Sequence, residues 1–337
     1  MKDTSKPALH GWLVLDKPRG MGSTQAVGKV KRLLRESGYA KTKVGHGGTL
    51  DPLAEGVLPI ALGEATKLAG RMLDSDKIYD FTIAFGEETD TLDSEGEVIA
   101  RSDRFPPLAA IAGMLDHFTG EIEQLPPAYS AILVDGKRAY DLARAGEEVK
   151  LQPRRVTIHS LGFAGGAGRS GEGRMLGSSF QNQGGRPDPF SATAPLKVAE
   201  AVTLTAHVSK GTYIRSLARD IALALGSRGH VTYLRRTKAG PFREQQAISL
   251  DFAGESDKGP RLDDLILPLE AGLDDISALS LDRTSAQAVR QGRVLSGMPQ
   301  LPGLYLAKLG DVPVALVEIE GGTAKVVRGF NLPDVAE

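Results

Sequence analysis

The sequence predicts a mixed α/β protein that ends in a small, mostly β module. Short apolar runs alternate with helical patterns over roughly the first 245 residues, and glycine-separated strand patterns fill residues 276–333. The chain has 337 residues, which is long for a single hydrophobic core. We therefore expect a large domain over residues 1–250, a connector over 251–275 and a small module over 276–333.

The first elements follow from local patterns. Residues 11–16 (GWLVLD) form an apolar run typical of a buried strand. Ser23 or Thr24 is a suitable N-cap for the next segment, whose apolar residues recur at helical spacing. A glycine-dense loop, GHGGTLDPLAEG (45–56), then leads into an apolar strand over residues 57–62.

The middle of the chain continues the alternation of strands and helices. Polar and apolar residues alternate over 78–85, which predicts a half-buried strand, and TDTLDSEG (89–96) is rich in turn-forming residues. The further strand patterns cover 98–100, 155–163, 196–208 and 230–238, and the helical patterns cover 108–118, 138–145 and 212–225.

The charge is unevenly distributed along the chain, although the formal net charge is only −1. Residues 1–50 carry ten Lys or Arg against three acidic residues, and residues 207–243 carry eight against one. Residues 244–337 are acidic, with fifteen acids against eight bases. Two basic stretches could form one electropositive face for a nucleic acid, although unrelated solvated surfaces explain the same charges equally well.

Residues 164–190 form a glycine-rich, low-complexity insert. Such a composition buries too little apolar surface to offset the entropy of ordering the chain, so we expect a surface loop. Its three arginines, Arg169, Arg174 and Arg186, leave open a second interpretation in which the insert contacts an RNA backbone.

The composition excludes several classes of chemistry. The chain has no cysteine, which excludes disulfides, thiolate catalysis and cysteine-bound zinc. Neither a signal-peptide pattern nor an apolar segment of membrane-spanning length is present, so we expect a cytoplasmic protein with no membrane contact.

The loop at 45–56 is the strongest candidate for a functional site. Glycines at 45, 47 and 48 allow a close approach of the backbone to a ligand, and Asp51 stands between Leu50 and Pro52. A carboxylate fixed in this way can act as a nucleophile, a base or an electrostatic stabiliser. The loop lacks the phosphate-binding GxxxxGK[ST] pattern, and His46 and Asp51 lack further clustered metal ligands. Asp-Pro after glycines is also a common structural turn.

The segment GHGGTLDPLAEGVLPIALGEATKL (45–68) resembles the G-H-x-G-x-L-D-P-x-A-x-G-x-L motif of bacterial tRNA pseudouridine-55 synthases, the TruB family. Further blocks agree in the family's order: LDKPRGMGS (15–23), DKIYDFTIAFGEETDTLDSEG (76–96), PPAYSAILVDGKRAYDLARAGEEV (126–149) and SKGTYIRSLARDIALALGSRGHVTYLRRT (209–237). The resemblance spans roughly residues 10–245. It implies a central, mainly antiparallel sheet of pseudouridine-synthase type flanked by helices, with a PUA-like module at the C-terminal end.

The resemblance implies that Asp51 is the catalytic aspartate. The reaction breaks the N1–C1′ glycosidic bond of a T-loop uridine, turns the uracil and rejoins it through C5, without a cofactor. Asp51 could attack C6 of the base, attack C1′ of the ribose or remove the C2′ proton, and the sequence leaves these routes open.

Other site residues are implied by the same resemblance. Tyr79 matches the tyrosine that stacks on the uracil, and Leu234 matches an apolar contact to that base. Tyr213 matches a pocket tyrosine near the base, and Arg215 matches the arginine that pairs with the catalytic aspartate. His46 matches the histidine that contacts the T-loop after the nucleotide flips out. The expected contacts to the RNA backbone are Lys67, Lys17, Arg19, Lys137 and Arg138.

Two other functions use the same features. A non-catalytic chaperone that folds the tRNA elbow would need the basic surfaces but not Asp51. A carboxylate-dependent glycoside hydrolase would need a second, acidic carboxyl group, for which Glu55 and Asp90 are the candidates. The resemblance favours a monomeric enzyme that acts on the T arm of tRNA.

Overall fold

The computed structural model describes residues 6–165, 198–250 and 261–332. The glycine-rich insert with Arg169, Arg174 and Arg186 lies almost entirely outside these residues. The chain forms two compact units. The first contains Met1–Asp51, Gly56–Leu73 and Ala239–Glu337, and the second contains Pro52–Glu55 and Asp74–Lys238, so the chain passes between the units four times.

The first unit is built around strands β1 (Gly11–Lys17) and β3 (Glu55–Leu62). They pair in antiparallel register from Gly11 opposite Leu62 to Lys17 opposite Gly56. The short strands β2 (Val44–His46) and β14 (Ile248–Ser249) extend this sheet, β2 antiparallel to β3 and β14 parallel to β1. The strands predicted over 11–16 and 57–62 are confirmed.

Helix α1 (Ser23–Glu36) follows β1 and buries its apolar stripe. The predicted N-cap is wrong by one residue, because the cap is Gly22 rather than Ser23 or Thr24. The Gly22 N–H donates to the side chain of Gln25 in the first turn at 2.9 Å, and no side chain at the N-cap accepts from the helix.

Trp12 on β1 organises the core of the first unit. Its indole packs against Phe242 at a ring-centroid distance of 5.2 Å and donates to the carbonyl of Leu269 at 3.0 Å. A Cβ at Gly272 would lie 2.8 Å from this indole, so only glycine fits there. Leu269 and Leu273 are buried in the same cluster, which places this part of the predicted connector against β1.

The short elements near this core are η1 (Gly63–Leu68), α2 (Ala69–Asp74), β13 (Phe242–Arg243), η3 (Glu244–Gln246), η5 (Leu262–Leu265) and η6 (Leu269–Gly272).

The C-terminal module is mostly β, as predicted, and consists of a five-stranded sheet with one helix. The strand order is β15-β17-β18-β19-β16, and helix α6 begins after Asp282, whose carboxylate accepts from the Ser285 N–H at 2.7 Å. The bounds are β15 (Ser277–Ser280), α6 (Arg283–Arg290), β16 (Leu295–Ser296), β17 (Gly303–Leu309), β18 (Val312–Glu320) and β19 (Thr323–Gly329). Three apolar side chains of the module pack in the cluster around Trp12 and not in the module's own core: Leu306, Leu316 and Phe330.

The second unit contains a five-stranded part of the sheet in the order β12-β4-β11-β10-β7. Strand β11 pairs antiparallel with β4 and β10, and β10 pairs antiparallel with β7. Their bounds are β4 (Lys77–Phe85), β7 (Gly120–Gln124), β10 (Arg154–Phe163), β11 (Ala201–Val208) and β12 (Gly229–Ala239).

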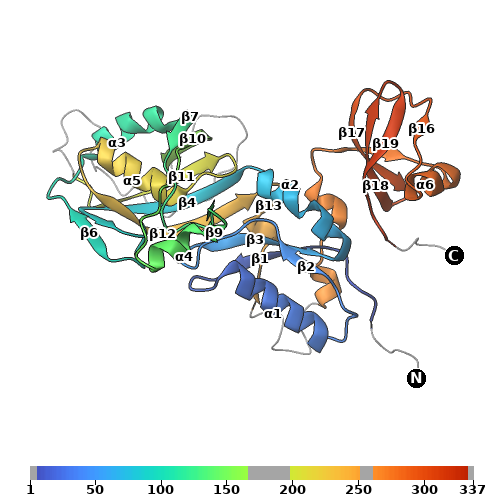
Figure 1. Ribbon diagram of the computed structural model, residues 1–337, viewed down its shortest axis with the longest axis horizontal. Coiled ribbons are helices and arrows are strands. Elements are labelled where there is room, and N and C mark those ends of the chain that lie inside the picture. The colour runs from blue at the N-terminus through green and yellow to red at the C-terminus, as the bar shows by residue number, and fades with distance from the viewer. Residues whose placement is uncertain (1–5, 166–197, 251–260, 333–337) are drawn as a thin grey trace, which may run out of the picture. The chain divides into compact units, whose positions relative to one another are not determined.

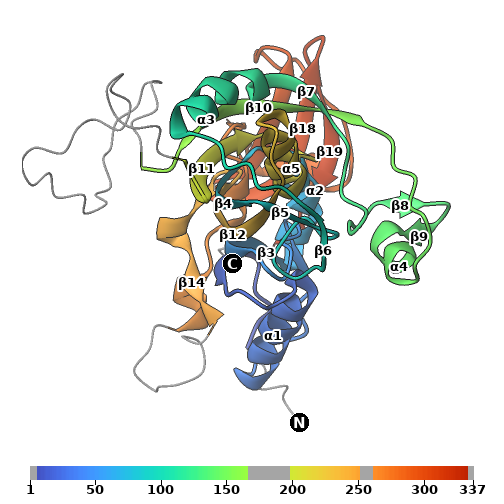
Figure 2. The ribbon, with the colours of Figure 1, turned by 90° about the vertical axis from the view of Figure 1, so that its left-hand side faces the viewer.

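Two helices cover one side of these strands, where α5 (Ile214–Ala224) contacts β4 and α3 (Leu108–Leu115) contacts β10 (Figure 1). The remaining elements are β5 (Glu87–Thr89), β6 (Val98–Arg101), η2 (Asp116–Phe118), β8 (Leu133–Val134), β9 (Lys137–Arg138) and α4 (Ala139–Arg144). Figure 2 shows the β8–β9 hairpin and α4 to one side of β10 and β11. The mixed α/β fold with a mainly antiparallel sheet is confirmed, whereas the domain boundaries remain predictions. In the described segments, no helix is long and apolar enough to cross a membrane.

Lys67 ties the C-terminal module to η1. Its ammonium lies 2.7 Å from the Glu64 carboxylate and donates to the carbonyl of Gly329 at 2.9 Å. The same carboxylate accepts from the Asn331 N–H at 2.7 Å. Burial alone would raise the pKa of Glu64, but the hydrogen bonds from Lys67 and Asn331 outweigh it and lower that pKa below its ordinary value of 4.5.

We predict that Glu64→Gln lowers the free energy of unfolding on the order of 1 kcal/mol at neutral pH, because it removes the charge that Lys67 and Asn331 contact. A carboxyl group with a lowered pKa in the folded state stabilises the protein above pH 4.5 and loses this effect as the pH falls through the folded-state value. Urea unfolding from pH 7 to pH 3 should therefore show a smaller acid loss for Glu64→Gln than for wild type. Glu318→Gln, at an exposed position of β18, is the control. Equal acid losses in all three proteins would contradict the prediction.

Candidate active site

Ser23 fixes the backbone immediately before Asp51. Its hydroxyl accepts from the Leu50 N–H at 2.8 Å and donates to the Leu50 carbonyl at 3.0 Å. Both residues are 4% exposed, so water does not compete for these bonds. The hydroxyl predicted to cap α1 instead holds the loop of Asp51, whose own side chain is half-buried.

Two of the three glycines in this loop are explained by the packing and the backbone conformation of the loop itself. A Cβ at Gly47 would lie 2.7 Å from the Cβ of Met72, and the Gly47 N–H donates to the Pro59 carbonyl at 2.8 Å. Gly48 has a φ of +134°, a conformation that favours glycine. Gly45 has open space beside it. Close packing thus explains Gly47, and backbone conformation explains Gly48.

His46 lies on β2 opposite Ile60 and is half-buried. Its Nδ1 accepts a long hydrogen bond of 3.4 Å from the Gly48 N–H. Within the described residues, neither His46 nor Asp51 belongs to a group of metal ligands.

In the second unit, Arg215 is the centre of a buried polar network. Its guanidinium donates to the carbonyl of Thr91 at 2.8 Å and to that of Tyr129 at 3.0 Å. It also lies 3.5 Å from the Asp93 carboxylate, and both side chains of this ion pair are 5% exposed. Three partners from two separate segments therefore fix the orientation of the guanidinium.

Hydrogen bonds to the Asp93 carboxylate stabilise the turn at 89–96. That carboxylate accepts from the Thr91 hydroxyl at 2.6 Å and from the Glu95 N–H at 3.0 Å. Leu92 has a φ of +63°, which is strained for a leucine, and a Cβ at Gly96 would lie 2.2 Å from Asp90 Oδ1. The segment that was predicted only as a turn therefore supplies two partners of Arg215, the Thr91 carbonyl and the Asp93 carboxylate.

Tyr213 is the N-cap residue of α5 and is held through its backbone. The side chain of Gln124 accepts from the Tyr213 N–H at 2.8 Å and donates to the Tyr213 carbonyl at 3.1 Å. Gln124 is fully buried, and the guanidinium of Arg154 lies 5.5 Å from the centre of the tyrosine ring. Sequence reasoning missed Gln124, because a single glutamine at the end of a strand carries no pattern.

Tyr79 and Leu234 lie on the neighbouring strands β4 and β12. Lys77 precedes Tyr79 by two residues and shares its face of the strand. Burial and, to a smaller extent, the nearby Arg236 lower the pKa of Lys77 to about 8, although the carboxylates of Asp76 and Asp74 raise it. An amine that is partly neutral near physiological pH is a chemically unusual neighbour of Tyr79, and the sequence contained no signal for it.

The candidate residues are distributed over both units. Tyr213 and Arg215 lie together at the start of α5, and Tyr79 and Leu234 lie on adjacent strands of the same second unit. Asp51, together with His46 and Lys67, belongs to the first unit. The pairing of Arg215 with the catalytic aspartate remains a prediction.

The predicted contacts to the RNA backbone have different surroundings. Lys17 is fully buried and donates to the carbonyls of Pro18 and Met21 at 3.0 and 2.6 Å, so its predicted contact with phosphate is wrong. Lys67 is partly exposed and engaged with Glu64. Lys137 and Arg138 are exposed on the β8–β9 hairpin.

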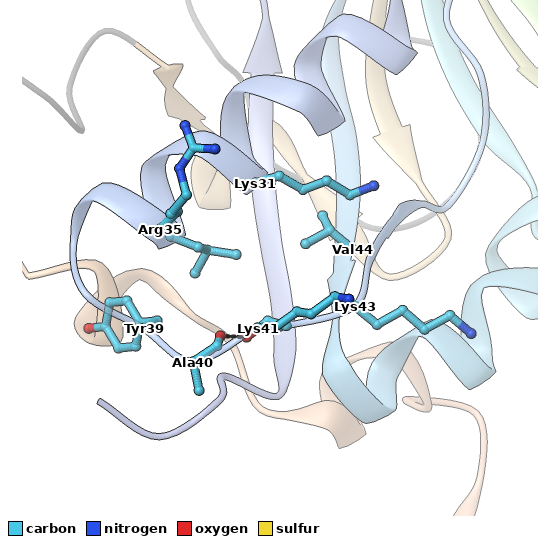
Figure 3. Close-up of a pocket in the computed structure, with 9 residues that line it drawn as sticks. Lys31, Arg35, Tyr39, Ala40, Lys41, Lys43 and Val44 are labelled. Carbon is cyan, nitrogen blue, oxygen red and sulfur yellow. Dashed lines mark hydrogen bonds between the residues drawn. The ribbon is translucent and has the colours of Figure 1, made fainter. Parts of the chain in front are cut away.

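A basic groove lies between α1 and the segment that leads to β2 (Figure 3). Its volume is about 790 Å³, and its cationic side chains are Lys31, Arg35, Lys41 and Lys43. Tyr39 and Val44 supply apolar surface. Exposed cations suit a phosphate backbone, and this groove comes from the basic stretch at 1–50.

Comparisons with known proteins identify the family. Residues 31–171 match the N-terminal domain of the TruB family pseudouridylate synthases, and residues 215–274 match the C-terminal domain of tRNA pseudouridylate synthase B. The chain is 60% identical to the tRNA pseudouridine synthase B of Novosphingobium aromaticivorans, over 98% of this chain and 100% of that protein. The chain belongs to the TruB family of pseudouridylate synthases. A second TruB relative, from Zymomonas mobilis, is 52% identical over 96% of this chain and 97% of that protein.

Solved structures agree with TruB membership at the level of the fold. A chain in a Cbf5-Nop10-Gar1 complex has a TM-score of 0.63 and 26% identity, and the match covers 95% of this chain and 84% of that one. A chain in an H/ACA RNP bound to a substrate RNA that contains 2′-deoxyuridine has a TM-score of 0.63 and 23% identity, over 96% of this chain and 86% of that one. The latter likeness shows the fold alone.

We predict that Asp93→Asn lowers the free energy of unfolding by about 3 kcal/mol, because it removes a buried negative charge 3.5 Å from the Arg215 guanidinium. Arg215→Lys should cost about 2 kcal/mol, since an ammonium cannot reach all three partners of the guanidinium. Urea unfolding of both single variants and the double variant gives their coupling energy, expected to exceed about 0.5 kcal/mol. Arg228→Lys, in the more exposed pair with Glu88, is the control and should cost less than about 1 kcal/mol. Additive effects of Asp93→Asn and Arg215→Lys would show that the two side chains act independently.

Proposed function

We propose that this protein is a tRNA pseudouridine synthase that converts the T-loop uridine at position 55 to pseudouridine. Two TruB relatives at 60% and 52% identity are named tRNA pseudouridine synthase B. The feature that carries the proposal is the loop of Asp51, where the sequence matches the family motif and the buried Ser23 hydroxyl fixes the preceding residue. A rigid backbone places a carboxylate reproducibly against a reacting bond.

In this proposal, Asp51 acts on the glycosidic bond or on the base of a flipped uridine. The N1–C1′ bond breaks, the uracil turns and a C5–C1′ bond forms, after which C5 loses its proton and N1 gains one. The uracil must stay bound while it is detached from the ribose. Tyr79 and Leu234 are proposed to hold the base, and stacking on a tyrosine contributes about 1–3 kcal/mol per base. The three routes for Asp51 remain alternatives.

Arg215 and Tyr213 are proposed to support this carboxylate. A guanidinium beside a carboxylate keeps it ionised and fixes its rotamer, and the orientation of Arg215 is already set by the Thr91 and Tyr129 carbonyls. Tyr213, held at its backbone by Gln124, is proposed to move a proton near the base. Neutral groups therefore position both residues: Gln124 holds Tyr213, and two backbone carbonyls hold Arg215. The Asp93 carboxylate also holds Arg215 by its charge.

The RNA is proposed to contact His46 at the T-loop and the exposed cations with its phosphates. The groove lined by Lys31, Arg35, Lys41 and Lys43 supports this, as do Lys137 and Arg138 on the exposed hairpin. The T arm would be recognised by shape and by base flipping rather than by reading a duplex sequence. A cytoplasmic location follows from a tRNA substrate, and a monomer remains a prediction.

The glycoside-hydrolase alternative loses support from the surroundings of its two candidate acids. Glu55 forms an ion pair with Arg235 at 3.2 Å. Asp90 accepts from the Tyr129 hydroxyl and the Glu97 N–H, both at 2.9 Å. Each carboxylate therefore has a structural role. A tRNA chaperone remains an alternative, since it would use the same basic surfaces.

Primer extension after carbodiimide treatment tests the proposal, because carbodiimide adducts of pseudouridine stop the reverse transcriptase. Unmodified tRNA incubated with the wild-type protein should show one new stop, in the T-loop at position 55. A tRNA with cytidine at position 55 is the control and should show none. A stop at another uridine would overturn the assigned position. Binding of tRNA with no stop anywhere would favour the chaperone.

A further inference from the structure

Asp76, His159 and His207 form a compact cluster in the second unit, and none of the three has a role in the proposed function. Their ligand atoms all lie within 4.8 Å of one another. Asp76 Oδ2 is 3.2 Å from His159 Nε2 and 3.7 Å from His207 Nε2. The two imidazole rings have a centroid distance of 4.7 Å.

The backbone of the sheet creates this cluster. Asp76 immediately precedes β4, whereas His159 and His207 lie on β10 and β11. The β10–β11 register shifts between Ile158 and Ser160, so that His159 and Ser160 both stand opposite the single residue His207. Such a bulge redirects a side chain, and here it leaves His159 beside the ring of His207.

One ring nitrogen of the cluster is left unsatisfied. His207 Nε2 is buried and has no hydrogen-bond partner within the part of the chain that the structure describes. The 3.7 Å to Asp76 is too long for a hydrogen bond. A buried polar atom without a partner is costly, and a ligand between His207 and Asp76 would remove this cost.

We propose that Asp76, His159 and His207 bind a divalent transition-metal ion, with Zn²⁺ the best-suited ion. Zn²⁺ binds imidazole nitrogen and carboxylate oxygen at about 2.0–2.2 Å in tetrahedral geometry, which requires ligand atoms roughly 3.3 Å apart. The separations of 3.2 and 3.7 Å from Asp76 are close to this value. The separation between the two imidazole ligand atoms is at most 4.8 Å, so side-chain rotation must bring them together around the ion. Two imidazoles and one carboxylate leave the fourth position to water.

The surroundings set the expected strength of the site. Lys238 acts on His207 and repels a cation. The three side chains are 31–45% exposed, so water competes for the ion. We expect a dissociation constant on the order of 1–10 μM, tighter for Zn²⁺ than for Mg²⁺ or Ca²⁺, which prefer oxygen ligands.

Calorimetric titration of untagged, full-length protein with ZnCl₂ tests the proposal. One ion should bind per chain, and Co²⁺ should give the visible absorption of a site with nitrogen ligands. His159→Asn and His207→Asn should each weaken binding at least about tenfold. His117→Asn, a histidine of the same unit outside the cluster, is the control and should bind as wild type does. Circular dichroism checks that each variant is folded.

Two results would overturn the proposal. One is a wild-type protein that binds no Zn²⁺ at 100 μM. The other is undiminished binding in the His159→Asn/His207→Asn double variant, which would place the ion elsewhere on the chain. The cluster would then be an ordinary Asp–His ion pair. Neither result bears on pseudouridine formation, because the test measures the metal alone.

Discussion

The two hydrogen bonds between the Ser23 hydroxyl and the backbone of Leu50 set the position of the chain one residue before Asp51. A side chain at the start of α1 thereby controls a loop that follows β2, and Gly47 allows the same loop to pack against Met72. Without these contacts a glycine-rich segment would sample many conformations. The proposed catalysis depends on this constraint, because a carboxylate accelerates a bond rearrangement only when it is held against the reacting atoms.

Buried polar contacts also hold two other proposed site residues, Tyr213 and Arg215, and each contact joins segments far apart in the chain. Gln124 holds the backbone of Tyr213, and the carbonyls of Thr91 and Tyr129 orient Arg215 beside Asp93. The contacts of Gln124 are neutral hydrogen bonds, whereas the charged Arg215 guanidinium donates to neutral carbonyls, and both kinds are directional. The Arg215–Asp93 ion pair adds two buried opposite charges 3.5 Å apart. The strained Leu92 lies in the turn that holds Asp93.

Local periodicity was enough to predict most strands and helices. The apolar run of β1, the alternation in β4 and the helical spacing in α1 each depend on neighbours within one element. The N-cap was missed because the Ser23 hydroxyl is used by Leu50, which is 27 residues away. Gln124 and the partners of Arg215 were missed for the same reason, since those contacts span 86 to 124 residues. Asp51 was predicted because one continuous motif contains it, whereas its surroundings come from separate parts of the chain.

The most direct test of the central claim uses tRNA labelled with tritium at C5 of uridine, because formation of the C5–C1′ bond releases that atom. Tritium release and tRNA binding should be measured on Asp51→Asn, a nearly isosteric variant, alongside wild type. We expect binding within about twofold of wild type and a rate of release lower by at least about 10³-fold. Release at the wild-type rate, or loss of tRNA binding in the variant, would contradict a catalytic role for Asp51.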